Sequence, residues 1–302
     1  MTIQSLTMRR FQKAFFLFFC ICLLPAISIA DESKELFTKI KRYAEVANAA
    51  YLSEQEARGI LEAQGYHLVQ YNSVPGVEVN YLVATNDVLK QQIIAVRGTA
   101  NINNAIADIS LKLLPDAHAN IVLHQGFAQA AEAIYREALP VLNKNYKTST
   151  TGHSLGGAVA VILAMYLDVD HYDLGPIITF GQPKVTNVRG ALAFKHLDIT
   201  RVVTSQDLVP LVPPLDVMDI NNIDIYWHLG KEIVLLKGHE YAVLEGLKSM
   251  MRATRVINAT LSPENLEHHQ MTRYLQQVED KIEAASLVPY ETGIDLLKLF
   301  GG

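Results

Sequence analysis

The chain has 302 residues, of which 50% are hydrophobic and 19% are charged, and its formal net charge is -5. This length is enough for one large α/β domain with a proper core, or for two small ones. The sequence has no long basic run and no arginines alternating with aromatics, so nucleic acid is excluded as an expected partner.

Residues 1–30 differ in composition from the rest of the chain. Three cations precede an uncharged apolar run, and small residues follow at the positions that a signal peptidase recognises. This pattern predicts a secretory signal peptide cut after Ala30, with export to the periplasm or the medium. A transmembrane anchor is the alternative, but the apolar run is interrupted at Pro25 and is short for a bilayer span. No linker or repeat follows, so we expect residues 31–302 to form a single domain.

Cleavage at this point has two consequences for the exported protein. It removes three cations and no anion, which changes the formal charge from -5 to -8. It also removes Cys20 and Cys22, the only cysteines, so the exported domain would fold without a disulfide.

The first predicted elements are two helices followed by three strands. The helices span 31–51 and the stretch from Ser53 to Gly65, and the strands span 66–71, 77–85 and 91–97. Ser53 begins its helix with a capping box. Turn signals between the strands predict an antiparallel start to the sheet. We interpret residues 102–114 as a short lid helix.

The rest of the chain alternates between helices and strands. Strands are expected at 148–151, 176–180, 201–204 and, as the last one, 231–236, and helices at 126–143, 242–256 and from Ser262 to about Ala285. Residues 211–230 are expected to form a long loop, and 286–302 a short helix or an ordered tail. This alternation predicts an α/β fold with a mostly parallel central sheet and helices on both faces.

The stretch with the most specific chemistry is Gly152-His153-Ser154-Leu155-Gly156, which lies between a β-compatible run and an apolar helix. This is the strand, turn and helix context that the Gly-x-Ser-x-Gly pattern requires, so Ser154 is the candidate nucleophile. Glycines on both sides remove collisions that a Cβ would cause at such a tight turn. The Leu155 N–H, at the start of the helix, is expected to point toward an oxyanion above Ser154.

A serine hydroxyl needs a base, and histidine fits because its pKa lies near neutral pH. In this fold class the order is serine, acid, histidine, which leaves six candidates: His171, His196, His228, His239, His268 and His269. The residues alone do not choose among them. Asp207, directly after a buried strand, is favoured as the acid over Asp198, Asp216 and Asp219. The histidines lack metal-ligand spacing, so no metal site is expected.

Taken together, the chain from about Gln92 to Leu275 resembles the class 3 lipase family, typified by triacylglycerol lipases of filamentous fungi. The resemblance rests on an ordered set of motifs: Val96-Arg97-Gly98-Thr99, Asp108, His124-Gln125-Gly126-Phe127, the turn at 152–156, Thr179-Phe180-Gly181-Gln182-Pro183, the stretch from Ser205 to Pro210, His228, and His269-Gln270-Met271 with Tyr274.

The resemblance implies an α/β-hydrolase fold with Ser154 as nucleophile, Asp207 as acid and His269 as base. The offset of Tyr274 from His269 selects that histidine over its neighbour. The family also places the Thr99 N–H beside that of Leu155 in the oxyanion hole. Positions implied to be scaffold are His124, His228, Asp108, Gly181 and Pro183, and His153 is expected to pack or hydrogen-bond beneath the turn rather than to catalyse.

The implied function is a serine carboxylic ester hydrolase that acts on lipid esters through an acyl-enzyme, with no cofactor. Its partners would be a lipid or small ester substrate and, transiently, a lipid surface. Alternatives are a phospholipase A1 or small-ester esterase with the same triad, and an inactive lipid-binding protein. The sequence departs from the fungal enzymes in lacking cysteines after residue 30 and a lid tryptophan, since its only tryptophan is Trp227. A preference for long-chain triglyceride therefore does not follow.

Overall fold

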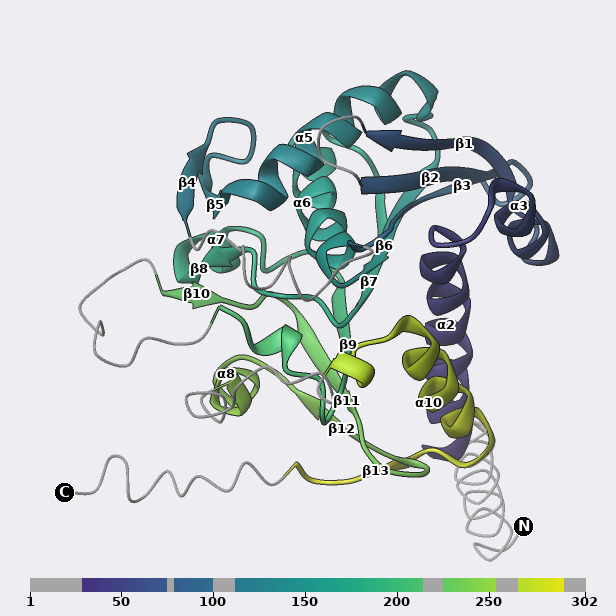
Figure 1. The fold of residues 1–302 in the computed structure, drawn as a ribbon, viewed down its shortest axis with the longest axis vertical. Coiled ribbons are helices and arrows are strands. Elements are labelled where there is room, and N and C mark those ends of the chain that lie inside the picture. The colour runs from purple at the N-terminus through teal and green to yellow at the C-terminus, as the bar shows by residue number, and fades with distance from the viewer. Residues whose placement is uncertain (1–28, 75–78, 100–111, 214–224, 254–265, 291–302) are drawn as a thin grey trace, which may run out of the picture.

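A computed structural model of the protein describes residues 29–74, 79–99, 112–213, 225–253 and 266–290. Its centre is a nine-stranded sheet with the order β1-β2-β3-β6-β7-β9-β11-β12-β13 (Figure 1). The strands are β1 (His67–Val74), β2 (Val79–Asn86), β3 (Gln91–Val96), β6 (Lys147–His153), β7 (Leu174–Phe180), β9 (Ile199–Thr204), β11 (Lys231–Leu235), β12 (Glu240–Leu244) and β13 (Ser286–Leu287). A smaller sheet contains β4 (Leu113–Asp116), β5 (Ile121–His124), β8 (Thr186–Asn187) and β10 (Tyr226–Trp227).

The middle of the large sheet is parallel. β3, β6, β7, β9 and β11 pair with one another in parallel, whereas β1, β2 and β3 are joined as antiparallel neighbours. All six residues of β9 are buried, because both faces of a central strand are covered. The mostly parallel sheet with an antiparallel start, as predicted from the sequence, is confirmed.

Helices cover both faces of this sheet. On one face α2 (Ile29–Ala49) and α10 (Met271–Ala284) lie side by side, and on the other α5 (Gln125–Ala138) packs against α6 (Leu155–Val169) (Figure 1). The shorter helices are α3 (Glu54–Ala63), α7 (Val188–Ala193), α8 (Leu247–Ala253) and the 3-10 turns η1 (Leu139–Val141) and η2 (Val209–Leu211). The predicted capping box is present at the start of α3, between Ser53 and Glu56.

Two predicted helices are wrong in part. Residues 242–244 of the helix expected at 242–256 belong to β12, which buries Ala242 and Leu244 while pairing with β11, so 231–236 is not the last strand. Gly246, with a φ of 53°, separates β12 from α8. The helix expected from Ser262 to Ala285 is interrupted by a turn at His268 and His269, and α10 begins only after Gln270.

Several expectations lie wholly or partly outside the described residues. The signal segment is described only from residue 29, and the expected cleavage after Ala30 falls in the first turn of α2. The proposed lid helix is described only at residues 112–114, and the helix prediction is wrong at 113–114, because these residues pair with β5 as part of β4. Asp108 is not described. The described residues also exclude 214–224 of the long loop and 291–302 of the tail. The start of the tail, 286–287, forms β13.

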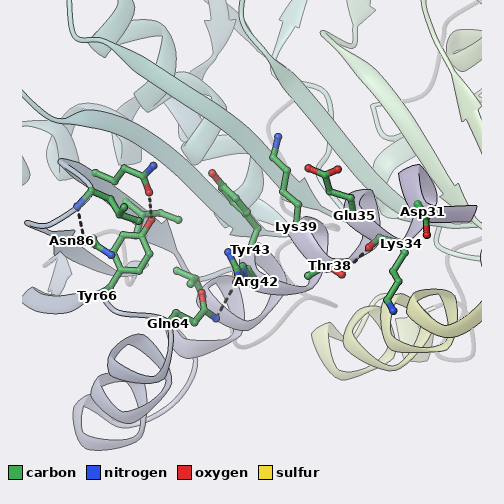
Figure 2. Close-up of a pocket in the computed structure, with 14 residues that line it drawn as sticks. Asp31, Lys34, Glu35, Thr38, Lys39, Arg42, Tyr43, Gln64, Tyr66 and Asn86 are labelled. Carbon is green, nitrogen blue, oxygen red and sulfur yellow. Dashed lines mark hydrogen bonds between the residues drawn. The ribbon is translucent and has the colours of Figure 1, made fainter. Parts of the chain in front are cut away.

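Two further features of the described residues bear on function. No helix among them has the length and apolar character needed to cross a bilayer. A groove of about 600 Å³ runs along one side of α2, past the end of β2 and the start of β3 (Figure 2). It lies at the amino ends of the parallel strands, the edge opposite to the one where Ser154 and Asp207 follow their strands.

Candidate active site

Ser154 lies at the tip of a tight turn between β6 and α6. Its backbone has a φ of 60° and a ψ of -132°, a combination that costs a non-glycine residue about 1–3 kcal/mol. The turn is tight enough that a Cβ at Gly152 would overlap the carbonyl of Gly156, and a Cβ at Gly156 would overlap that of Val96. Glycine is therefore required on both sides of the serine. Ser154 itself is buried, with an exposed fraction of 2%.

Asp207 follows the carboxyl end of β9 and is fully buried. Its Oδ2 lies 2.7 Å from Nδ1 of His269 and accepts a second hydrogen bond, at 2.5 Å, from the hydroxyl of Tyr274. Its Oδ1 accepts the backbone N–H of Val209 at 2.9 Å. Three donors thus fix the carboxylate, and the carboxylate in turn orients the imidazole.

The proton positions around Asp207 follow from its neighbours. Burial, and then the charge of Asp207, raises the pKa of Tyr274 well above its ordinary value, so the phenol keeps its proton and donates it. Because Nδ1 of His269 donates to the carboxylate, Nε2 of the neutral ring is an acceptor. Nε2 is buried and has no hydrogen-bond partner among the described residues, so the bond from the Ser154 hydroxyl is not made in this structure.

The other histidines after Ser154 have different neighbours. His196 contacts Asp168, and His228 and His239 contact the backbone carbonyls of Pro210 and Asp280. Within the described ranges, the one hydrogen bond of His268 is that which its backbone carbonyl accepts from the hydroxyl of Thr204. Of the rival acids, Asp198 lies at the amino end of β9, opposite to the end that Asp207 follows. Asp216 and Asp219 lie outside the described residues.

The segment after β3 lies directly against the nucleophile. A Cβ added to Gly98 would lie 2.9 Å from Cβ of Ser154, so this loop approaches the turn as closely as a glycine allows. In the next residue, Thr99, the hydroxyl oxygen is buried without a hydrogen-bond partner within the described part of the chain. Leu155 is the first residue of α6, where the helix has its free N–H groups. Buried polar atoms without partners are uncommon, and such atoms beside a serine favour a ligand-binding role.

His153 hydrogen-bonds beneath the turn, as expected. Its Nδ1 lies 2.7 Å from the hydroxyl of Tyr51, and its Nε2 lies 2.6 Å from the backbone carbonyl of His269. Burial first, and then the nearby His269, lowers the pKa of His153 well below its ordinary value. Tyr51 was not foreseen as a site residue, because in the sequence it is only the last residue of a predicted helix.

The positions expected to be scaffold have structural neighbours. His124 caps the start of α5 by accepting the N–H of Phe127, and Gly181, with a φ of 57°, lies so close to His269 that a Cβ would approach Cε1 to 2.8 Å. No three histidine, cysteine or acidic side chains within the described ranges lie close enough together to hold a metal ion.

The family model for class 3 lipases matches residues 93–217. Over this stretch the chain is similar to class 3 lipases. The chain is 32% identical over 142 residues to a secreted mono- and diacylglycerol lipase of Fusarium solani, a stretch that covers 44% of this chain and 42% of that protein. It is 30% identical over 169 residues to a lipase of Rhizomucor miehei, and this stretch covers 50% of this chain and 45% of that lipase. The chain therefore spans less than half the length of these curated relatives.

Solved structures confirm the α/β-hydrolase fold. Lipase II from Rhizopus niveus superposes on this chain with a TM-score of 0.58 at 25% identity, over 67% of this chain and 81% of that one. The strands and the turn that hold Ser154 lie within the matched residues, whereas His269 and Tyr51 lie outside the stretch that the family model covers.

Proposed function

We propose that this protein is a serine carboxylic ester hydrolase that acts on lipid esters. The observation that supports it most is the hydrogen bond between Asp207 and His269, whose Nε2 has no partner among the described residues. The backbone carbonyl of His269 also bonds to His153, the residue before Ser154, which brings the imidazole segment to the turn. Ser154 is then the nucleophile, His269 the base and Asp207 the acid that orients the base.

The reaction has two halves. In the first, Oγ of Ser154 attacks the ester carbonyl carbon while its proton passes to Nε2 of His269, and the tetrahedral intermediate expels the alcohol, which takes that proton. In the second, water attacks the acyl-serine ester and gives a proton to Nε2. The intermediate then releases the fatty acid, and Ser154 recovers its proton from His269.

The oxyanion of each intermediate needs hydrogen-bond donors. We assign the backbone N–H groups of Thr99 and Leu155, since the first lies in the loop against Ser154 and the second starts α6. Loss of one such donor typically lowers kcat by about 10²–10³-fold. The unpartnered hydroxyl of Thr99 adds a further polar group on this side of the serine.

Ser154→Ala tests the mechanism. It removes the nucleophile and should lower kcat for p-nitrophenyl esters by about 10⁴–10⁶-fold while leaving the fold intact. The matched control is Ser73→Ala on an exposed position of β1, which should hydrolyse as the wild type does. A fluorophosphonate probe should label wild-type protein and Ser73→Ala but not Ser154→Ala. Failure to label the folded wild type would favour the inactive lipid-binding alternative, and equal rates for both variants would exclude Ser154 from the mechanism.

The substrate class of the enzyme is tested by a panel of esters. The Fusarium relative is named for mono- and diacylglycerol, which supports an acylglycerol ester. Emulsified triglyceride, monoacylglycerol, phospholipid micelles and soluble butyrate ester distinguish a lipase from a phospholipase A1 and from a small-ester esterase. A rise in rate above the solubility limit of the ester would show transient binding to a lipid surface.

We also propose that residues 1–30 are a signal peptide and that the rest is exported as one domain. A relative described as secreted supports this, together with the composition of the segment. Amino-terminal sequencing of the protein recovered outside the cytoplasm should begin at Asp31. Recovery of the intact amino terminus from the cytoplasm alone would contradict export.

A further inference from the structure

Tyr51, in the turn just after α2, contacts two segments of the candidate site at once. Its hydroxyl accepts the backbone N–H of Gly98 at 2.9 Å and lies 2.7 Å from Nδ1 of His153. Gly98 precedes Thr99 in the oxyanion loop, and His153 precedes Ser154. One phenol oxygen therefore joins the two segments that flank the ester carbonyl in the proposed mechanism.

The direction of each hydrogen bond follows from the protonation states. The carbonyl of His269 is only an acceptor, so Nε2 of His153 must carry the proton that it donates. Since the lowered pKa keeps His153 neutral, its Nδ1 carries no proton and must accept one from Tyr51. Burial raises the pKa of Tyr51 to about 12, so the phenol is protonated and can donate. The chain of bonds runs in one direction, from Gly98 through Tyr51 and His153 to His269.

We propose that Tyr51 is a positioning residue for ester hydrolysis, which holds the oxyanion loop, the Ser154 turn and the His269 segment in register through His153. This proposal rests on the proposed function. The three segments come from distant parts of the chain, so none holds another by local geometry. Removal of the hydroxyl would leave the Gly98 N–H and Nδ1 of His153 without partners inside a buried site.

The geometry around Gly98 shows how little room the loop has. A Cβ at this position would lie 2.5 Å from the hydroxyl oxygen of Tyr51 and 2.9 Å from Cβ of Ser154. The backbone at Gly98 therefore lies between the phenol of Tyr51 and the side chain of Ser154. A shift of this peptide when the phenol oxygen is lost would turn the Thr99 N–H away from the oxyanion, which weakens the transition state more than the bound substrate.

The test compares Tyr51→Phe with Tyr71→Phe. Tyr71 is a matched control, because its hydroxyl donates to the carbonyl of Leu52, the residue after Tyr51, and within the described residues it makes no hydrogen bond to Gly98 or His153. We expect Tyr51→Phe to lower kcat by about 10–100-fold with KM within about twofold of the wild type. Tyr71→Phe should keep both constants. If Tyr51→Phe and Tyr71→Phe have the same kcat, the proposal is wrong.

A measurement that needs no turnover separates this proposal from the proposed function. Imidazole ¹⁵N signals of His153, assigned by their loss in His153→Asn, should show a bare Nδ1 and a protonated Nε2 in the wild type and in Ser154→Ala. In Tyr51→Phe the Nδ1 signal should shift, whereas in Tyr71→Phe it should not. A protonated Nδ1 in the wild type would overturn the network even if esters are hydrolysed. An intact network in a protein that hydrolyses no ester would refute only the function.

Discussion

Two carboxylates of the molecule, Asp207 and Glu232, are both buried, with exposed fractions of 0% and 1%, but their donors differ. Asp207 accepts hydrogen bonds from a histidine, a tyrosine and a backbone N–H. Glu232 instead lies between two guanidinium groups. Nε of Arg252 lies 2.7 Å from its Oε1, and Nη2 of Arg201 lies 3.6 Å from its Oε2.

We define the charged cluster as Glu232, Arg201, Arg252, Ser249 and Lys184. It joins β9, β11 and α8, because Arg201 and Glu232 are register partners on adjacent strands while Ser249 and Arg252 belong to the helix. Burial by itself would raise the pKa of Glu232, but the two arginines hold it below its ordinary value. The hydroxyl of Ser249 also donates to Glu232.

This difference separates a reactive site from a structural one. Both carboxylates are buried and hydrogen-bonded, so a buried carboxylate does not by itself indicate a reaction. The candidate site differs in that Asp207 orients an imidazole, which can take up a proton, whereas Glu232 meets guanidinium groups and a hydroxyl. It also differs in that Ser154 adopts a strained backbone conformation. We therefore expect substitutions of Asp207 to change kcat and substitutions of Glu232 to change stability.

Of the substitutions that compare the two carboxylates, Asp207→Asn has the largest expected effect. An amide at this position can donate to Nδ1 of His269, which then carries its proton on Nε2 and cannot accept one from Ser154. We expect kcat for a soluble ester to fall by about 10⁴-fold, with the urea midpoint little changed. A variant that keeps more than a tenth of the wild-type kcat would mean that Asp207 does not orient the base.

Glu232→Gln makes the same carboxylate-to-amide change in the charged cluster. It leaves Arg201 and Arg252 buried without their counter-ion, which should lower the free energy of unfolding by about 3–5 kcal/mol. Urea titration followed through the single tryptophan, Trp227, measures this loss. Per folded molecule, kcat should stay within about twofold of the wild type.

The control for Glu232→Gln is Glu240→Gln, at an exposed position in β12. Its urea midpoint should match that of the wild type, because neutralising an exposed carboxylate at this position does not leave a buried charge unpaired. Unchanged stability in Glu232→Gln, or a loss of kcat as large as in Asp207→Asn, would remove the distinction between the two clusters.

The smallest expected effect concerns Lys184, whose Nζ donates to the carbonyls of Leu211 and Pro213, both at 2.5 Å. Burial, followed by the charges of Arg201 and Arg252, lowers the pKa of Lys184 from 10.5 to about 7. Between these two values the unfolded chain holds the proton and the folded protein does not. Stability should therefore rise with pH across this window and should not change below it through this group.

Lys184→Met removes this titration and makes it measurable. From pH 7 to pH 10 the free energy of unfolding of the wild type should rise relative to Lys184→Met by about 1 kcal/mol per pH unit. Lys195→Met, at an exposed lysine just after α7, should follow the wild type. Parallel pH profiles for the wild type and Lys184→Met would show that Lys184 stays charged in the fold.

Local patterns predicted the elements whose causes are local. The capping box of Ser53 and Glu56 and the apolar run of β9 were identified correctly, because propensity and burial pattern agree there. Residues 242–244 were assigned wrongly to a helix, since pairing with β11 decided their conformation. The turn at His269 was missed for the same reason, because its partners lie more than sixty residues away in the chain.

The Gly-x-Ser-x-Gly pattern alone predicted the turn at Ser154, because a Cβ at Gly152 would overlap the carbonyl of Gly156 within the same turn. The overlap of a Cβ at Gly156 with the carbonyl of Val96 depends in addition on the neighbouring strand β3. The family resemblance selected His269 over His268, but only the tertiary structure brings His269 to Asp207 and joins Gly98 to His153 through Tyr51. Those contacts depend on how α2 and α10 pack on one face of the sheet, and no short stretch of the chain encodes that packing.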